Sequence, residues 1–477
     1  MANLFPNGIH GLADSRWSGV EGSVAVMKGI DIHSTPGLIK VHQKLTKDSG
    51  ATVDALVRVR VAASDGSTLW FSYTTGKIWR RTSAGAWALE HTTTPAAGTA
   101  GCLGAEEYDG YIYWATQSRL HRKPTTDLSD WTDAEEDWAT FQKTDAEFHP
   151  MVKQNLQLFI GDANVVAKVD NSTGSHVFDN EALDLNTPFR VKTMIDFDID
   201  ILIGTITNTT VNKTEVLRWD TEDTSWVASD QIDENGINCF IRDDNFVYVN
   251  AGQFGRIYVY TGDQLVPAKR IPGSWSPTKT AEIYPQAATT LLTIPVFGLS
   301  NITGNPAEQG VYSFGAYSKD YSKVLDLSYV ISENVVATIE IGSVLAVGAD
   351  LLVAWKNGSS FGVDKLDYTA KYASAVIETR MLSGGELREA LKTLGLIYAN
   401  YASLPASTGI TFSYRKYAAD SYTALTAALD DTKLQQLRSE ISAGDIANLQ
   451  LKIAFTVSSN DAPEIEQIGY KDNTTDA

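Results

Sequence analysis

Short apolar segments that alternate with polar residues and are separated by tight turns recur along most of this chain. The clearest example spans Leu69–Trp87, where Leu69-Trp70-Phe71 is followed by a turn at Gly76 and then by Ile78-Trp79. Alternation of this kind around a glycine turn is typical of a β-hairpin with one buried face. The pattern therefore predicts an antiparallel, all-β protein.

The pattern returns with a regular spacing. Successive copies are separated by roughly 43–46 residues, and the last step stretches to about 59. The equivalent apolar positions are Leu69, Ile112, Leu158, Ile201, Val247, Leu292 and Leu351. This spacing is the period of a propeller blade made of four antiparallel strands. Although no two copies match closely in sequence, the repeated pattern predicts a seven-bladed β-propeller over residues 51–376.

Residues 1–50 do not fit the repeat. They contain two strand-like segments, 24–32 and 37–41, after loop-like residues with Gly and Pro. A propeller must join its last blade to its first, and a strand from the opposite terminus is a common closure. We expect a strand from residues 24–45 to complete the final blade. The alternative is an arm that docks on a neighbouring subunit.

The pattern changes again near residue 377. At 477 residues the chain is longer than the roughly 320 that seven blades require. The remaining segment has longer alternating stretches and one possible helix, 431–439. The expected strands are Leu391–Tyr398, Ile410–Arg415, Leu449–Phe455 and Glu464–Tyr470. This arrangement predicts a separate small β-sandwich over residues 377–477.

Charge and composition narrow the classes of partner. The net charge of −19 disfavours binding to a nucleic-acid backbone, which requires a basic surface, and it disfavours an anionic bilayer as main partner. No basic-plus-apolar leader and no apolar run of membrane-spanning length occurs. We expect no nucleic-acid partner, no membrane insertion and synthesis in the cytoplasm. Cys102 and Cys239 are too few for a disulfide framework or a zinc cluster, and we expect buried free thiols.

Acidic residues near strand starts are the main candidates for chemistry, because propellers host glycosidases that use paired carboxylates. These residues are Asp196, Asp198, Asp200, Asp243 and Asp244. The alternation of the first three would place them on one strand face, where they could hold a hard cation. A polar strand at an exposed edge or along the channel is the interpretation that the sequence favours.

Other catalytic and metal-binding patterns are missing from the sequence. The histidines have neither HxH nor HExxH spacing; they are His10, His33, His42, His91, His121, His149 and His176. There is no Gly-x-Ser-x-Gly elbow and no phosphate-binding glycine loop. We therefore expect no enzyme, with no catalytic, cofactor-binding or metal-binding residues and no cofactor.

Several segments outside the repeat resemble a module of tailed-bacteriophage virion proteins. In the C-terminal part they are Leu391–Tyr398, Leu404-Pro405, Thr408–Arg415, Leu449–Ile453 and Ala462–Tyr470. In the N-terminal part they are Met27–Ile32 and Pro36–Leu38, which are similar to the segment that precedes a propeller in those proteins. These motifs are patterns of strands and turns, without a chemically reactive signature.

The resemblance implies a structural component of a bacteriophage virion, in the tail, neck or baseplate. It implies that the chain is made in the host cytoplasm and resides in the virion, where its partners are other virion proteins and copies of itself. The C-terminal sandwich and the N-terminal arm would dock, and the rigid propeller would be exposed. The alternative is a propeller-fold carbohydrate-binding protein or glycoside hydrolase that acts on a host surface glycan or receptor. That alternative requires a carboxylate pair about 5–10 Å apart in a concave site.

Overall fold

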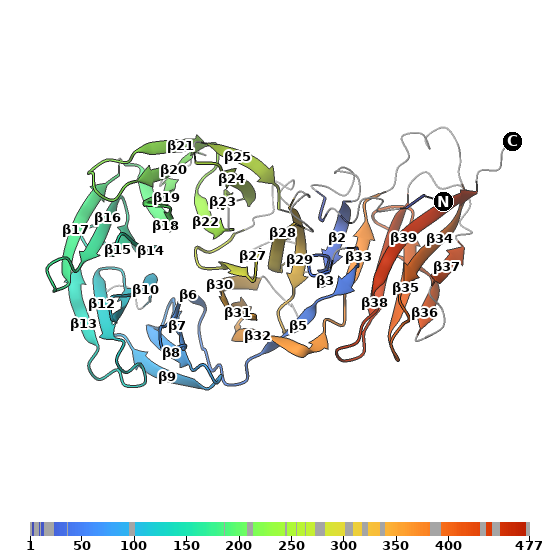
Figure 1. The fold of residues 1–477 in the computed structure, drawn as a ribbon, viewed down its shortest axis with the longest axis horizontal. Helices are drawn as coiled ribbons and strands as arrows, with labels where there is room; N and C mark the ends of the chain where they lie inside the picture. The colour runs from blue at the N-terminus through green and yellow to red at the C-terminus, as the bar shows by residue number, and fades with distance from the viewer. Residues whose placement is uncertain are drawn as a thin grey trace.

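The computed structural model describes residues 2–3, 9, 11–13, 23–35, 37–94, 101–185, 187–207, 213–243, 246–253, 255–262, 264–271, 282–300, 309–316, 323–333, 339–381, 393–429, 436–440 and 449–473. Every regular element in these ranges is a β-strand. Most strands form a ring, and the C-terminal strands lie beside it (Figure 1). The prediction of an all-β chain built on a β-propeller is confirmed.

Five consecutive segments each form a separate four-stranded blade, in which neighbouring strands pair antiparallel in chain order. Their strands are β6 (Val57–Ala62), β7 (Thr68–Ser72), β8 (Lys77–Arg81) and β9 (Trp87–Thr92); β10 (Gly104–Tyr108), β11 (Tyr111–Ala115), β12 (Arg119–Pro124) and β13 (Glu135–Thr140); β14 (Met151–Gln154), β15 (Gln157–Asp162), β16 (Val165–Asp170) and β17 (Val177–Asp184); β18 (Phe189–Phe197), β19 (Asp200–Thr207), β20 (Thr214–Trp219) and β21 (Ala228–Ile232); β22 (Ile237–Arg242), β23 (Val247–Ala251), β24 (Arg256–Tyr260) and β25 (Leu265–Lys269).

A sixth four-stranded blade closes the ring with a strand from the N-terminal segment. It consists of β30 (Ile339–Val347), β31 (Asp350–Asn357), β32 (Ser360–Lys371) and β5 (Gln43–Lys47). β5 pairs antiparallel with β32, and Leu45 stands opposite Leu366. β30 contacts β6 of the first blade, so the ring closes there. The sequence predicts a closing strand here from residues 24–45; the observed strand, Gln43–Lys47, overlaps the end of that range, and the strand-like segments 24–32 and 37–41 lie outside this blade.

The remaining part of the ring belongs to a nine-stranded sheet. Its order is β26 (Ala288–Leu291), β27 (Ile294–Leu299), β28 (Gly310–Gly315), β29 (Val324–Tyr329), β2 (Val24–Lys28), β33 (Val376–Thr379), β38 (Gln450–Thr456), β35 (Gly409–Arg415) and β36 (Thr423–Leu429). β26 contacts β22 on one side and β30 on the other. Among the described residues the propeller thus has six separate four-stranded blades, and β26–β29 continue into the C-terminal strands.

A second C-terminal sheet contains β1 (Ala2–Asn3), β39 (Ile465–Asn473), β34 (Thr393–Tyr401) and β37 (Gln436–Glu440). A short pair, β3 (Ile30–Asp31) and β4 (Lys40–Val41), lies in the N-terminal segment. One apolar cluster contains Ile397 and Ile468 from the second sheet, Phe412 from β35 and Leu327 from β29. The expected division at residue 377 falls within β33, where the apolar core is continuous.

The four expected C-terminal strands correspond to β34, β35, β38 and β39. The expected helix over 431–439 is wrong where it can be compared, because Gln436–Glu440 is the strand β37, paired with β34. Backbone pairing with a neighbouring strand outweighs the helix propensity of this segment. Residues 431–435 lie outside the described residues.

Small residues at the end of second strands let successive blades approach closely. A Cβ on Gly204 in β19 would lie 2.7 Å from Cγ2 of Ile237 in the next blade. It would also lie 2.6 Å from Cγ2 of Thr193 in its own blade. Gly161 in β15 and Gly298 in β27 meet Val191 and Ile341 in the same way. Interiors packed at this density have no room for extra methyl groups.

We expect Gly204→Val to lower the free energy of unfolding by about 1–3 kcal/mol, because the added side chain must displace the next blade. Gly174→Asn is the control, since Gly174 lies in a turn with φ +80° and open space, which Asn tolerates. Urea unfolding of the two variants measures the difference. Equal stability of both would contradict tight packing between blades.

The closing strand β5 should contribute to the stability of the entire ring. Leu45 is buried in the main apolar cluster, whereas Thr46 on the other face of β5 is half-buried. Leu45→Ala should reduce the unfolding free energy by about 2–5 kcal/mol, and Thr46→Ala by less than about 1 kcal/mol. Thermal and chemical unfolding of the purified chain provide the test. If both substitutions lower the unfolding free energy by the same amount, β5 is not packed as a strand of the blade.

Candidate functional site at the joint between the propeller and the C-terminal strands

The N-terminal segment joins the propeller to the C-terminal strands. β2 lies between β29 and β33, parallel to the first and antiparallel to the second. Ile39 and Ile465 exchange two backbone hydrogen bonds, of 2.9 and 3.0 Å. The Lys371 N–H at the end of β32 donates to Ser459 O over 2.7 Å. Backbone bonds thus connect three distant parts of the sequence at one joint.

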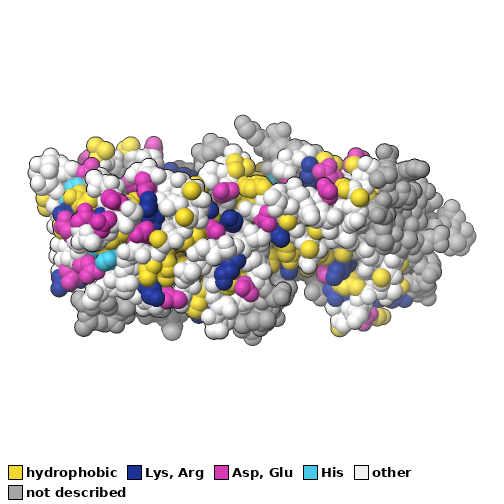
Figure 2. Space-filling view, turned by 90° about the horizontal axis from the view of Figure 1, so that it is seen from below, with side chains coloured by type: hydrophobic (Ala, Val, Ile, Leu, Met, Phe, Trp, Pro, Cys, Tyr) yellow, Lys and Arg dark blue, Asp and Glu magenta, His cyan; other side chains and the backbone are white. Residues whose placement is uncertain are grey.

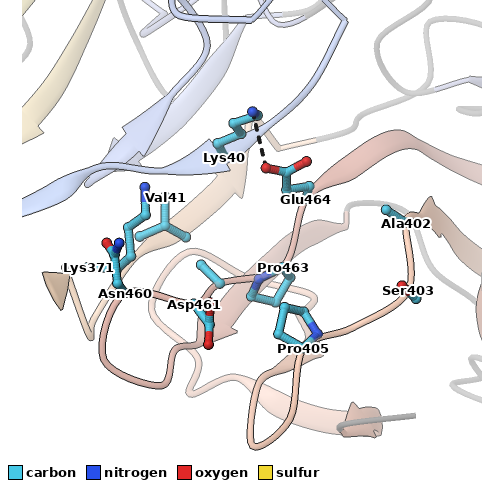
Figure 3. A pocket seen from close by; sticks show the side chains of 11 residues that line it. Lys40, Val41, Lys371, Ala402, Ser403, Pro405, Asn460, Asp461, Pro463 and Glu464 are labelled. Carbon is cyan, nitrogen blue, oxygen red and sulfur yellow. Dashed lines mark ion pairs between the residues drawn. The ribbon is translucent and has the colours of Figure 1, made fainter. Parts of the chain in front are cut away.

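A polar groove of about 300 Å³ opens at this joint (Figure 3). It is lined by Lys40 and Val41 of β4, by Lys371, and by the loops 402–405 and 460–464. Lys40 Nζ forms an ion pair of 3.1 Å with Glu464 Oε1 across it. Burial lowers the pKa of Lys371. The groove offers amines, carboxylates and an amide, which suits contact with a polar protein segment.

A buried polar network holds the N-terminal segment against the propeller. His33 Nε2 lies 2.7 Å from Asp326 Oδ1 on β29, and both side chains are almost completely buried. Ser328 Oγ donates to the Asp326 carboxylate and contacts Ser313 Oγ on β28 at 2.6 Å. His42 stacks at an angle on Tyr329 with 4.8 Å between ring centroids. Such a network stabilises only the arrangement in which its members are paired.

Two histidines of this network have pKa values shifted in opposite directions. Burial opposes the charged form of His33, but the Asp326 carboxylate, with Asp31, outweighs it and raises the pKa. Lys323 acts against this rise. For His42 burial dominates and lowers the pKa, although Asp31 and Asp326 act in the other direction. The contributions of the two histidines to the free energy of unfolding should therefore change with pH in opposite directions.

The folded-state pKa of His33 is raised, so the pairing of its charged form stabilises the folded state fully below the unfolded-state pKa of about 6.5. This stabilisation disappears as the pH rises through the folded-state pKa of His33. We expect the stability lost in His33→Gln to be larger at about pH 5.5 than at about pH 8.5. His42→Gln should show the opposite trend, because His42 disfavours the folded state once acid protonates it. Urea unfolding at both pH values tests the pair. Parallel trends would contradict the assigned network.

The candidate carboxylates do not form a common site. Asp196 pairs with Arg242 of the next blade at 2.8 Å, and Asp200 pairs with Arg218 of its own blade. Asp198 occupies the turn between β18 and β19 with φ +56°, while Asp243 pairs with Lys323. Asp244 lies outside the described residues. Within the described ranges, no three His, Cys, Asp or Glu side chains are grouped to hold a metal ion.

Two cations and one carboxylate of the described chain line a cavity at the centre of the ring, and Glu340 lies 3.6 Å from one of these cations, Arg58. First strands of successive blades contact one another there, for example β18 with β14 and β22. Of the described residues that line a cavity at this place, Glu147 alone carries a carboxylate, and Arg58 and Lys192 are cations. The sequence pattern does not distinguish these cations, because β6 and β18 each alternate apolar residues with two basic ones, Arg58 and Arg60 in the first and Arg190 and Lys192 in the second. Only knowledge of which face points to the axis would have identified them.

The remaining reactive groups are inaccessible. Cys102 and Cys239 are both free and buried, as expected. Burial raises the pKa of the Cys102 thiol to about 12, so the nucleophilic thiolate is scarce at neutral pH. No helix suited by length and apolarity to crossing a bilayer occurs in the described part of the chain.

Comparisons with known proteins find structural neighbours only. No family model matches the chain, and no curated protein matches it. The WD40 β-propeller domain of Doa1 is 15% identical, with a TM-score of 0.45, over 69% of this chain and 97% of that one. A virginiamycin B lyase from Staphylococcus aureus is 11% identical, with a TM-score of 0.45, over 69% and 99%.

A further neighbour is the extracellular domain of a hybrid two component system from B. thetaiotaomicron. It is 12% identical, with a TM-score of 0.47, and the match covers 77% of this chain. This chain spans 44% of that protein. The neighbours include WD40 domains and a lyase, so they share an architecture and not a function.

Proposed function

We propose that this protein is a structural component of a bacteriophage virion, in the tail, neck or baseplate. The single observation that carries the proposal is the nine-stranded sheet, which fixes the C-terminal strands to the propeller through the N-terminal β2. Of the segments that resemble phage virion proteins, Thr408–Arg415 and Leu449–Ile453 contribute β35 and β38 to this sheet, and Met27–Ile32 includes the end of β2. A rigid body with a fixed attachment region is what a mechanical role requires.

We further propose a finer description of the architecture. β26–β29 serve as the seventh blade, since they lie between two blades and pair in the same meander order. The two C-terminal sheets act as a sandwich, because Ile397, Ile468, Phe412 and Ile453 belong to one apolar cluster. On this description one sheet of the sandwich continues the blade of β26–β29 through β2 and β33.

Docking would involve the C-terminal strands and the N-terminal segment, and the propeller would be exposed. Tyr417, in the turn after β35, is one of the exposed large apolar side chains and lies in the C-terminal part. Tyrosine is enriched in protein interfaces. Acidic side chains gather at the end of the propeller farthest from these strands, with basic ones among them (Figure 2). The exposed Tyr417 supports contact with other virion proteins through the C-terminal part.

The alternative of a glycan-directed propeller has less support. A glycosidase requires two carboxylates on either side of a sugar. Among the described residues that line the central cavity, only Glu147 could serve, and it pairs with Arg190 at 3.4 Å. We therefore propose a role without catalysis.

Purified phage particles that carry the gene should contain the protein in a fixed stoichiometry, measured by mass spectrometry. Tyr417→Asp should reduce incorporation about tenfold or more, because it places a charge in the docking region. Leu156→Asp is the control, since Leu156 is 93% exposed on the propeller and should not affect incorporation. Absence of the protein from particles, or equal incorporation of both folded variants, would contradict the proposal.

A further inference from the structure

The cavity at the centre of the propeller has an excess of positive charge, although the chain as a whole is strongly acidic. It has a volume of about 70 Å³ and lies between β6, β10, β14, β18 and the residues that precede β26. Such a space holds a few groups the size of water. Arg58 from β6 and Lys192 from β18 reach it from different blades.

Lys192 is a buried cation; Glu282 and Glu147 favour its charged form, and its Nζ lies 5.4 Å from the centroid of the Phe148 ring. Its side chain is 5% exposed, and Nζ donates to Asn238 Oδ1 over 2.9 Å. Asn238 is itself held by bonds of 2.8 Å to Asn250 Oδ1 and Gly252 O. No carboxylate among the described residues lies within ion-pair distance of Nζ. An ammonium group has three protons to donate, so two remain for a ligand.

Arg58 is oriented toward the same cavity. Its guanidinium lies between the rings of Tyr73 and Tyr284, at 3.9 and 4.0 Å from their centroids. It donates to Tyr284 Oη over 2.9 Å and lies 3.6 Å from Glu340. Its buried Nε has no hydrogen-bond partner. A rigidly held guanidinium with a free donor is suited to an oxyanion.

The two cations also repel each other. Burial is the largest cause of the lowered pKa of Lys192; Glu282 and Glu147 act against it, and Arg58 adds a smaller lowering contribution than either carboxylate's effect. Burial of the Lys192 ammonium and the lack of an acceptor for Arg58 Nε both cost free energy. An anion between them would remove both costs.

We propose that the central cavity binds a small oxyanion, such as a carboxylate, phosphate or sulfate group, between Lys192 and Arg58. The anion joins the blade of β6 to the blade of β18 across the axis. This inference rests on the geometry of the cavity and does not depend on a virion role.

Calorimetric titration of the full-length protein with sulfate, phosphate and acetate, at ionic strength matched with chloride, tests the proposal. Binding should weaken about tenfold or more in Lys192→Met, since a charged hydrogen bond is lost. Lys143→Met, which removes the same charge from an exposed site, should bind as the original chain does. Stronger binding of phosphate than of acetate would identify a free inorganic ion, and the reverse would identify a carboxylate group.

Crystals of the unsubstituted protein grown with selenate give an independent result if Lys192→Met does not fold. The expected outcome is an anomalous selenium peak in contact with Lys192 Nζ. Selenate at surface lysines only, no measurable binding of any probe, or equal affinity of the two lysine variants would overturn the proposal.

Discussion

Backbone pairing at the ends of the sheets is the constraint on which this structure depends. A strand at the edge of a sheet presents unpaired N–H and C=O groups, and without the N-terminal segment β32 and β29 would each be such an edge. Here the N-terminal segment covers both: β5 completes the blade of β30–β32, and β2 covers β29. A few residues from one terminus thereby link the ring, the last blade and the C-terminal strands.

The side chains at the joint follow from this backbone arrangement. Once β2 is paired, His33 lies in a buried polar network, where the Asp326 carboxylate pairs with its imidazole. The apolar cluster then runs without a break from β29 to β35. The part of the propeller around β29 and the C-terminal strands therefore share one core, which explains why a boundary drawn by composition falls inside a strand.

Local sequence patterns predicted the features that depend on neighbouring residues, namely the hairpins and the spacing of the blades. Alternation and spacing identified the hairpins, and six of the seven equivalent positions lie in the second strand of a blade; Leu292 lies in the turn before β27. Alternation does not reveal which distant strand will pair, so the insertion of β2 between β29 and β33 was not predictable. The segment Gln436–Glu440 was misassigned because its composition favours a helix, whereas it pairs as a strand with β34. Lys192 was missed because its significance comes from its position at the axis.

The insertion of β2 next to β29 and β33 also bears on how the chain reaches this state. The strands that complete the ring are made first during synthesis, but their partners are separated from them by some three hundred residues of sequence. Contacts of such long range are costly in loop entropy and form late. Until they form, the early strands have no partner, and a nascent chain held by a chaperone or by a companion subunit would be protected from pairing with the wrong edge.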